Sequence, residues 1–214
     1  MLRVTAHLFR LIDLEMLLLV ALIAGLLIGL GWASWWHRPY QVPTLQSTWL
    51  AFAAFFPQIV IAYLPATRHL LADWLASTVL LVSLVFFAVF AWQNRHIPGM
   101  PILLAGLVLN LAVITTNGGW MPISPQTASR LTGSDVLGLA SLGSRFGQKD
   151  ILLLSQNMHF EFLADRFLLP DWIPYKVAFS LGDILVGTGI FWLLVHPSVK
   201  ATMPSGERVH LDYI

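Results

Sequence analysis

The sequence contains no cysteine, and only 11% of its residues are charged. The absence of cysteine excludes disulfide bonds, iron–sulfur clusters and thiol chemistry. Soluble domains usually carry about 25% charged residues, whereas this chain is 57% hydrophobic with a mean hydropathy of +0.74. The net charge of +1 gives no indication of nucleic-acid binding. The composition therefore predicts an integral membrane protein.

The sequence also lacks the short patterns that accompany known chemistry. It has no P-loop, no dinucleotide-binding fingerprint, no zinc-type ligand spacing and no internal repeat. It has no Gly-x-Ser-x-Gly elbow, and its apolar runs carry no paired acid and base. We therefore predict no catalytic residue and no metal site, expect the protein not to be an enzyme, and name no cofactor.

Five long apolar runs cover much of the chain, at residues 14–34, 45–64, 70–92, 100–116 and 175–195. Each is close to the roughly 20 residues that cross a hydrocarbon core. The runs are continuous rather than alternating, which indicates helices and not the strands of a barrel. They predict an all-α integral membrane protein with one membrane domain over residues 1–214. It would be a bundle of about five transmembrane helices with a long extramembrane loop, residues 117–174, and a polar tail, residues 196–214.

Asp183 is the most informative polar residue, because it lies inside the last apolar run. A carboxylate there costs roughly 2.5–3.5 kcal/mol on insertion scales. Asn110 lies at a comparable depth in the preceding run, Ser180 shares a helix face with Asp183, and Asn117 begins the turn on the loop side. These four residues predict a polar pocket for a small ligand or ion. The alternative is a structural cluster in which Asp183 bonds to Asn110 or caps the turn.

Two cations near the last run, Arg166 and Lys176, are candidates to neutralise Asp183. Arg166 also follows Asp165 directly. An adjacent Asp-Arg pair forms a loop-fixing salt bridge more often than a catalytic pair, so we expect a structural role for Asp165 and Arg166.

Small residues recur every four positions in the first run, and Gly25 and Gly29 are at the centre of this stripe. Such a stripe predicts close helix packing, either within the chain or against another subunit. Gln58 lies among alanines in the second run. It is expected to hydrogen-bond between helices or, alternatively, to line a pocket.

The histidines suggest no cofactor. His37, His69 and His96 lie near the ends of apolar runs, and His159 lies in the loop. Axial ligation of haem or chlorophyll needs a histidine that projects from a helix into a pocket. A metal site shared by His37 and His96 has no supporting carboxylate nearby. We expect interfacial side chains.

The long loop carries its own structural signals. Ser124 and Pro125 predict the N-cap and first residue of a short helix that ends before Gly133. Residues 150–169 mix apolar and polar side chains, which suggests an interfacial helix or a lid over the bundle.

Three strings resemble those of an uncharacterised family of small bacterial polytopic membrane proteins. They are Asn-Gly-Gly-Trp-Met-Pro-Ile-Ser-Pro at 117–125, Leu-Ala-Asp-Arg-Phe-Leu-Leu-Pro at 163–170 and Phe-Ser-Leu-Gly-Asp-Ile-Leu at 179–185. We expect structural roles for Gly118, Gly119, Pro122 and Gly182 within them. The resemblance implies a multi-pass protein of the bacterial inner membrane, and no activity.

Two functions fit these observations. The one we favour is a non-enzymatic accessory or scaffold subunit of a membrane complex, whose partners are membrane lipids and other membrane subunits, without nucleic acid. The alternative is a small-molecule or lipid-binding or transport protein with a polar pocket at Asn110 and Asp183. Transport has no inverted-repeat signature in its favour.

Overall fold

The computed structural model describes residues 13–37, 39–41, 43–63, 72–138, 140–147, 149–170, 172–173 and 176–196. Within these ranges the chain is mostly helical. Five helices are long and apolar: α2 (Asp13–Trp35), α3 (Thr48–Tyr63), α5 (Asp73–Gln93), α6 (Met100–Thr116) and α8 (Leu181–Val195).

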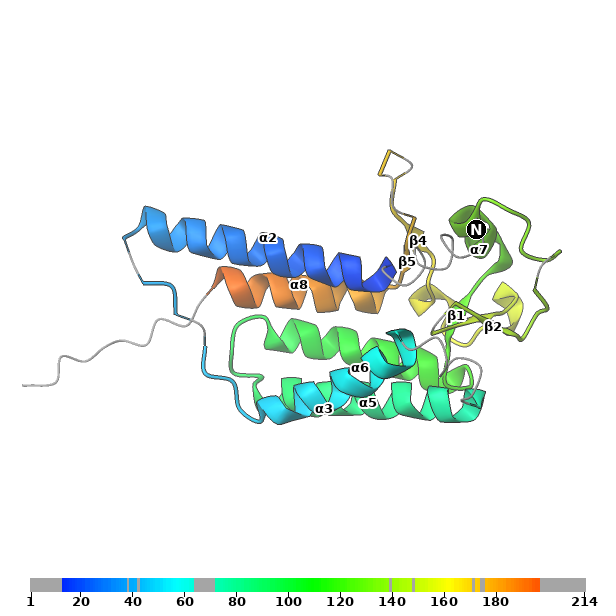
Figure 1. The fold of residues 1–214 in the computed structure, drawn as a ribbon, viewed down its shortest axis with the longest axis horizontal. Coiled ribbons are helices and arrows are strands. Elements are labelled where there is room, and N and C mark those ends of the chain that lie inside the picture. Colours follow the sequence, from blue (N-terminus) through cyan, green and yellow to red (C-terminus); the bar gives the residue numbers. More distant parts are fainter. Residues whose placement is uncertain are drawn as a thin grey trace, which may run out of the picture.

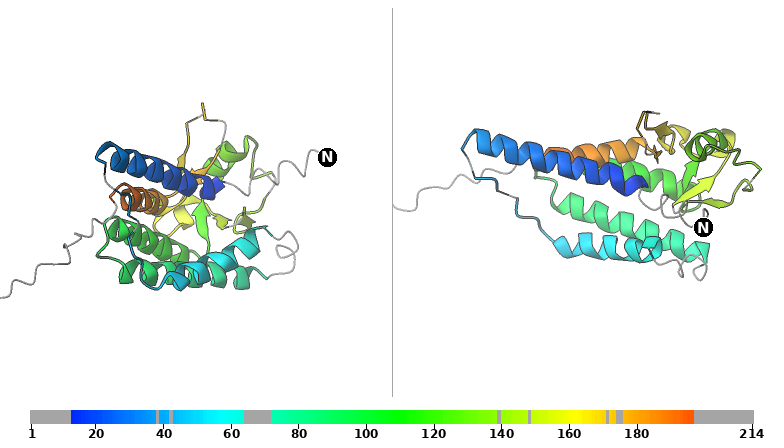
Figure 2. Two further views of the ribbon diagram at one scale, coloured as in Figure 1. Left: turned by 60° about the vertical axis from the view of Figure 1, so that its left-hand side comes forward. Right: turned by 45° about the horizontal axis from the view of Figure 1, so that its top comes forward.

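The five long helices form a row (Figures 1 and 2). Helix α8 packs between α2 and α6, α5 packs beside α6, and α3 packs beside α5. Helices α2 and α8 run parallel, because Gly25 of α2 faces Phe191 and Gly29 faces Leu194. Helices α6 and α8 run antiparallel, since Gly106 faces Gly182 while Gly99 faces Gly189. Glycine at these contacts lets the two backbones approach closely, as helix pairs in membranes do.

Two of these helices, over Leu18–Trp35 and Asp73–Gln93, are long and apolar enough to cross a membrane. Helices α3, α6 and α8 are apolar but shorter. At 1.5 Å per residue the 15 residues of α8 span about 22 Å. The two candidate spans are assigned by their length and composition.

The segment between α6 and α8, residues 117–180, folds over one end of the row and is called the cap below (Figure 1). Its elements are β1 (Met121–Ile123), α7 (Pro125–Thr132), β2 (Arg145–Phe146), β3 (Asp150–Leu152), the 3-10 turns η1 (Ser155–Asn157) and η2 (Glu161–Leu163), β4 (Phe167–Leu168) and β5 (Ala178–Phe179). Strand β3 pairs in parallel with β1 and antiparallel with β2. Strands β4 and β5 form a second, antiparallel pair. Ile123, Val136 and Leu152 fill the interior of the cap.

The short helix of the cap matches its prediction. The Ser124 hydroxyl accepts a hydrogen bond from the Thr127 backbone N–H at 3.1 Å, which satisfies one free donor at the helix start. Gly133 ends the helix with φ at 69°, a conformation that glycine adopts at little cost.

Three expectations were wrong. The protein is not all-α, because the cap contains strands. Residues 150–169 form no interfacial α-helix, since their backbone hydrogen bonds go to β1 and β5 and to two 3-10 turns. The last helix begins at Leu181 and not near residue 175, because residues 178–179 pair with β4 and Ser180 caps the helix. The fourth run, in contrast, coincides with α6.

Candidate functional site: a buried polar cluster

Asp183 lies in the first turn of α8 and not deep within it. Ser180 is the N-cap, and its hydroxyl accepts a hydrogen bond from the Asp183 backbone N–H at 3.0 Å. The Asp183 carboxylate Oδ2 in turn accepts from the Ser180 backbone N–H at 3.0 Å. This reciprocal capping box satisfies two free donors, and the helix dipole favours the negative charge there. Asp183 therefore sits at a helix start although only 4% of it is exposed.

Asn110 joins this helix start to α6. Its Nδ2 donates to Asp183 Oδ1 at 2.8 Å, and its Oδ1 accepts from the Ser180 hydroxyl at 3.0 Å. Gly182 makes room for this contact, because a Cβ there would meet the Asn110 side chain and would lie 2.8 Å from the carbonyl oxygen of Gly106. The sequence singled out Asn110, Ser180 and Asp183, and the structure places them in mutual contact.

Lys149 supplies the positive charge of the site. It precedes β3, and its Nζ lies 2.8 Å from Asp165 Oδ2 and 3.7 Å from Asp183 Oδ2. Asp165 is only 1% exposed, and it lies beside β1 through a bridge to Ile123. We call Asn110, Lys149, Asp150, Asp165, Ser180 and Asp183 the buried polar cluster. It links α6, the cap and α8 through side-chain contacts.

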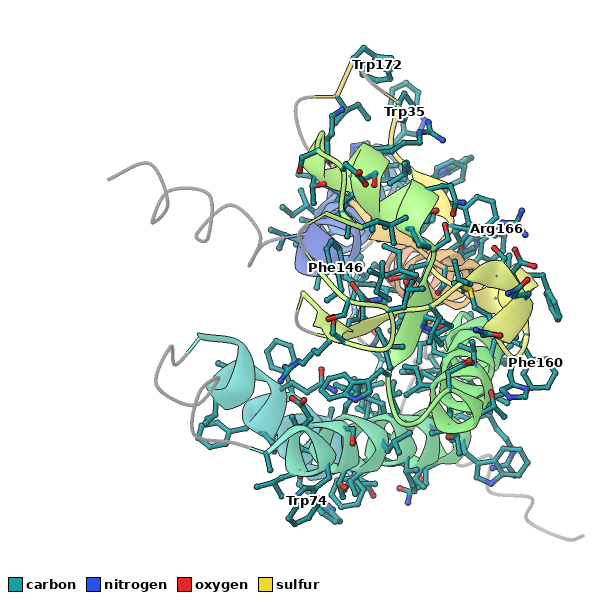
Figure 3. The ribbon with its side chains drawn as sticks, turned by 90° about the vertical axis from the view of Figure 1, so that its right-hand side faces the viewer. Trp35, Trp74, Phe146, Phe160, Arg166 and Trp172 are labelled. Carbon is teal, nitrogen blue, oxygen red and sulfur yellow. The ribbon has the colours of Figure 1, made fainter. Side chains whose placement is uncertain are left out.

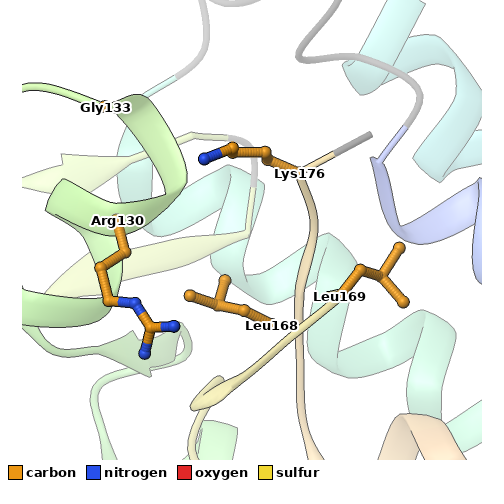
Figure 4. Close-up of a pocket in the computed structure, with 5 residues that line it drawn as sticks. All are labelled: Arg130, Gly133, Leu168, Leu169 and Lys176. Carbon is orange, nitrogen blue, oxygen red and sulfur yellow. The ribbon is translucent and has the colours of Figure 1, made fainter. Parts of the chain in front are cut away.

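The prediction that Arg166 or Lys176 neutralises Asp183 is therefore wrong, because Lys149 is the cation beside it. Arg166 is exposed and lies at the outer edge of the cap (Figure 3), so Asp165 pairs with Lys149 and not with its neighbour in sequence. Lys176 lines a surface cavity elsewhere in the cap (Figure 4). Sequence reasoning missed Lys149 because a lysine in a polar loop carries no signal of its own. The pairing of β1 with β3 brings it to the cluster.

The cluster holds one lysine against three carboxylates. Burial raises the pKa of Asp150 to about 6, against the lowering influence of Lys149. Burial likewise holds the pKa of Asp165 well above its usual range, although Lys149 opposes this effect. Burial alone would lower the pKa of Lys149, but the charges of Asp165, Asp183 and Asp150 outweigh it and raise this pKa. Lys149 is therefore charged, and the carboxylates compete for it.

Two carboxylate oxygens have no donor. Within the described residues, Oδ1 of Asp150 and Oδ1 of Asp165 are buried without a hydrogen-bond partner. Buried polar atoms are nearly always paired. These two oxygens are exceptions, and burial without a donor favours the neutral form of each carboxyl group.

Asn117 lies outside the cluster, contrary to its expected place in the pocket. Its side chain donates to the Val113 carbonyl at 2.7 Å and to the His159 carbonyl at 2.9 Å. It also accepts from the His159 backbone N–H at 3.0 Å. Asn117 therefore fastens the cap to the end of α6.

The residues expected to have structural roles lie in several places. Gly118 and Gly119 have φ of 75° and 87°, and a Cβ on Gly119 would lie 2.7 Å from Ser77 Cβ in α5. The turn at Gly118 and Gly119 therefore packs on α5, a contact that a side chain at Gly119 would obstruct. Pro122 is fully buried in β1, and Gln58 is half-buried in α3.

Three of the four histidines named above lie in the part of the chain that the structure describes. His37, His96 and His159 are exposed, and His69 lies outside the described residues. In the part of the chain that the structure describes, no group of three or more His, Cys, Asp or Glu side chains is arranged to hold a metal ion.

The chain belongs to the family of unknown function DUF5317, whose family model matches residues 43–195. An uncharacterized protein of Thermotoga maritima is 32% identical over 137 residues, which cover 63% of this chain and 73% of that protein. No solved structure matches the chain. The expected membership of an uncharacterised family is confirmed. The matched range includes the whole buried polar cluster, but it brings no activity with it.

Proposed function

We propose that this chain is a multi-pass protein of the bacterial inner membrane, with its five long helices in the bilayer. There it acts as a non-enzymatic accessory or scaffold subunit of a membrane complex. The exposed apolar faces of the helix row carry this proposal. Soluble monomers rarely expose contiguous apolar patches above a few hundred Å².

The exposed side chains on the helices are large and apolar. Leu27 of α2 is 64% exposed and Phe52 of α3 is 73% exposed. Residues 18–35, α3 and α6 contain no charged residue, and α5 has Asp73 at its start. The one charge within α8 is Asp183, which the buried polar cluster satisfies. Surfaces of this kind are stable against lipid or against another apolar protein.

One exposed face of α3 is rich in aromatic residues. Trp49, Phe52 and Phe56 lie at i, i+3 and i+7 on α3, so they share one helix face, and all three are exposed. Helix α3 is also at the end of the row, where it packs mainly on α5. Large aromatic side chains dominate the energetics of protein interfaces. This stripe is the face that we assign to a partner subunit.

The buried polar cluster supports a structural role and not a pocket. The polar atoms of Asn110, Ser180 and Asp183 bond to one another, so a ligand there would have to replace those bonds. The alternative function, a small-molecule or lipid-binding or transport site at Asn110 and Asp183, therefore has less support.

Purification from native membranes in lipid nanodiscs, with mass spectrometry of all proteins that accompany the chain, tests the proposal. We expect recovery in the carbonate-washed membrane fraction together with a stoichiometric partner. Phe52→Ala with Phe56→Ala should lose the partner at unchanged expression and melting temperature. The matched pair Val20→Ala with Leu27→Ala, on the exposed side of α2, should keep it.

The two parts of the proposal fail separately. Recovery in the soluble fraction would show that the helices do not span a membrane. Recovery in the membrane without any stoichiometric partner would leave the membrane location standing and refute the accessory role.

A further inference from the structure

The outer face of α5 is a continuous exposed stripe, called the α5 stripe below. Its members recur every three or four residues and so lie on one side of the helix. They are Trp74, Thr78, Val82, Val85, Val89 and Trp92. The buried residues of this helix lie on the other side, and they are Ala76, Ser77, Ser83, Leu84, Phe90 and Ala91. Figure 3 shows Trp74 pointing away from the neighbouring helices.

The middle of the α5 stripe is an apolar surface. Val82, Val85 and Val89 are 46%, 42% and 40% exposed. The hydroxyl of Thr78 donates to the Trp74 carbonyl at 2.7 Å, so this polar group is satisfied within the helix. Exposure of a row of valines to water is unfavourable, because apolar area gains free energy when it leaves water. A surface with satisfied polar groups is stable in lipid.

Tryptophans bound the α5 stripe at both ends. Trp74 and Trp92 are 18 residues apart, which is five full turns and about 27 Å along the helix axis. This separation is close to the roughly 30 Å thickness of a hydrocarbon core. Charge begins just outside each tryptophan. Asp73 precedes Trp74 and lies 3.5 Å from Arg145, and the Arg95 guanidinium lies 4.6 Å from the centre of the Trp92 ring.

Other helices carry tryptophans at the same end of the row as Trp92. Helices α2 and α8 end there (Figure 1), and Trp35 of α2 and Trp192 of α8 are both exposed. His196 stacks on Trp192 with the two ring centroids 4.4 Å apart. At the cap end, Trp172 is exposed like Trp74. Tryptophan at two levels with an apolar zone between them is the pattern of the aromatic belts of membrane proteins.

We propose that the α5 stripe faces the lipid of the bilayer, with Trp74 in the interface on the cap side and Trp92 in the opposite interface. The middle of the hydrocarbon core then lies level with residue 83, halfway between the two tryptophans. This inference rests on the membrane location proposed above. It goes further because it assigns this face to lipid, separately from the α3 face assigned to a partner, and fixes the depth of the chain in the bilayer.

Spin-label depth measurements test this register, and the absence of cysteine from the chain allows one label at a time. The variants are Thr78→Cys, Val82→Cys, Val85→Cys and Val89→Cys, each of the full chain extracted into polymer nanodiscs with its native lipids and partners. Collisions with oxygen report lipid, and collisions with a nickel chelate report water. The ratio of oxygen to nickel collisions should be highest at Val82 and Val85. Thr78 and Val89 lie about 7.5 Å and 9 Å from the midpoint by helix rise, so their ratios should be lower and similar to each other.

Two controls accompany these variants. Ser134→Cys places the label at an exposed position of the cap, where nickel collisions should dominate. The cysteine-free wild type, treated with the label in the same way, gives the signal of any partner protein.

Three outcomes overturn the inference. A highest ratio at Thr78 or at Val89 would refute the proposed depth. Few collisions with either reagent at all four positions would mean that a protein covers the stripe and not lipid. Nickel collisions at all four positions as frequent as at Ser134 would refute the membrane location itself, and with it the proposed function.

Discussion

Replacing Lys149 with methionine removes the cation of the buried polar cluster and keeps a side chain of similar length. Asp165 Oδ2 then loses its partner at 2.8 Å while only 1% of Asp165 is exposed. Asp183 loses a charge 3.7 Å away but keeps its bonds to Ser180 and Asn110. The damage should therefore fall mainly on Asp165.

Removal of one partner of a buried ion pair costs about 3–5 kcal/mol, because an uncompensated charge stays buried. For a chain of this size one kcal/mol corresponds to about 2–4 °C, so we expect the melting temperature to fall by roughly 6–20 °C. The loss should be smaller at pH 5 than at pH 8, since protonation of the carboxylates removes the orphaned charge. Addition of Asp165→Asn to Lys149→Met should restore roughly half of the loss.

Thermal unfolding in detergent, followed by the fluorescence of the nine tryptophans, measures these differences. Arg166→Met is the matched control, because it removes the exposed cation next to Asp165 in sequence. Its effect on the free energy of unfolding should be no more than about 0.5 kcal/mol, so the melting temperature should hardly change.

Two results would refute the reasoning. If Lys149→Met shifts the melting temperature no more than Arg166→Met does, Lys149 does not neutralise a buried charge. If Asp165→Asn lowers stability equally in the presence and absence of Lys149, the two side chains are not coupled.

Three further changes test other parts of the fold. Gly182→Ala should destabilise the chain by about 1–3 kcal/mol, since its Cβ would meet the Asn110 side chain. The control is Gly31→Ala in α2, where an added Cβ has nothing within 4 Å. It should be neutral or stabilising in the same melting assay. The pKa of about 6 for Asp150, above its ordinary 3.8, means that the folded state binds a proton more tightly than the unfolded chain. Stability from this group should therefore be full below about pH 4 and lost as pH rises through 6, and Asp150→Asn should flatten that slope in melting curves between pH 4 and 8. Asn117→Ala should free the 159–163 segment from α6, seen as faster amide exchange at His159 while exchange in the core of α6 stays slow.

Much of the helical part of the structure could be predicted from hydropathy. The fourth apolar run coincides with α6, and the others overlap α2, α3, α5 and α8. Asn110 and Asp183 stood out because a polar side chain inside an apolar run contrasts with its neighbours. Hydropathy misplaced the start of α8, since residues 175–179 are mostly apolar whatever backbone they adopt. The spacing of Ser180 and Asp183, a capping-box signature, was the signal that could have corrected it.

The cap was far less predictable. Lys149 contrasts with nothing around it in sequence, and its partner Asp165 is 16 residues away. Asn117 bonds to His159 across 42 residues. These contacts depend on the pairing of two- and three-residue strands, which leave a weak pattern in the sequence. Of the two readings of residues 150–169, an interfacial helix or a lid over the bundle, the helix was wrong for the same reason.

The cluster has a consequence for the order in which the chain is assembled. During synthesis α2, α3, α5 and α6 emerge before any of its charged members, and Asp183 emerges after Lys149, Asp150 and Asp165. Helix α8 can bring its carboxylate against α6 at low cost once the cap has folded far enough to present Lys149. The folding of the segment before it thus assists the docking of the last helix. A chain with a misfolded cap would leave α8 poorly docked against α6.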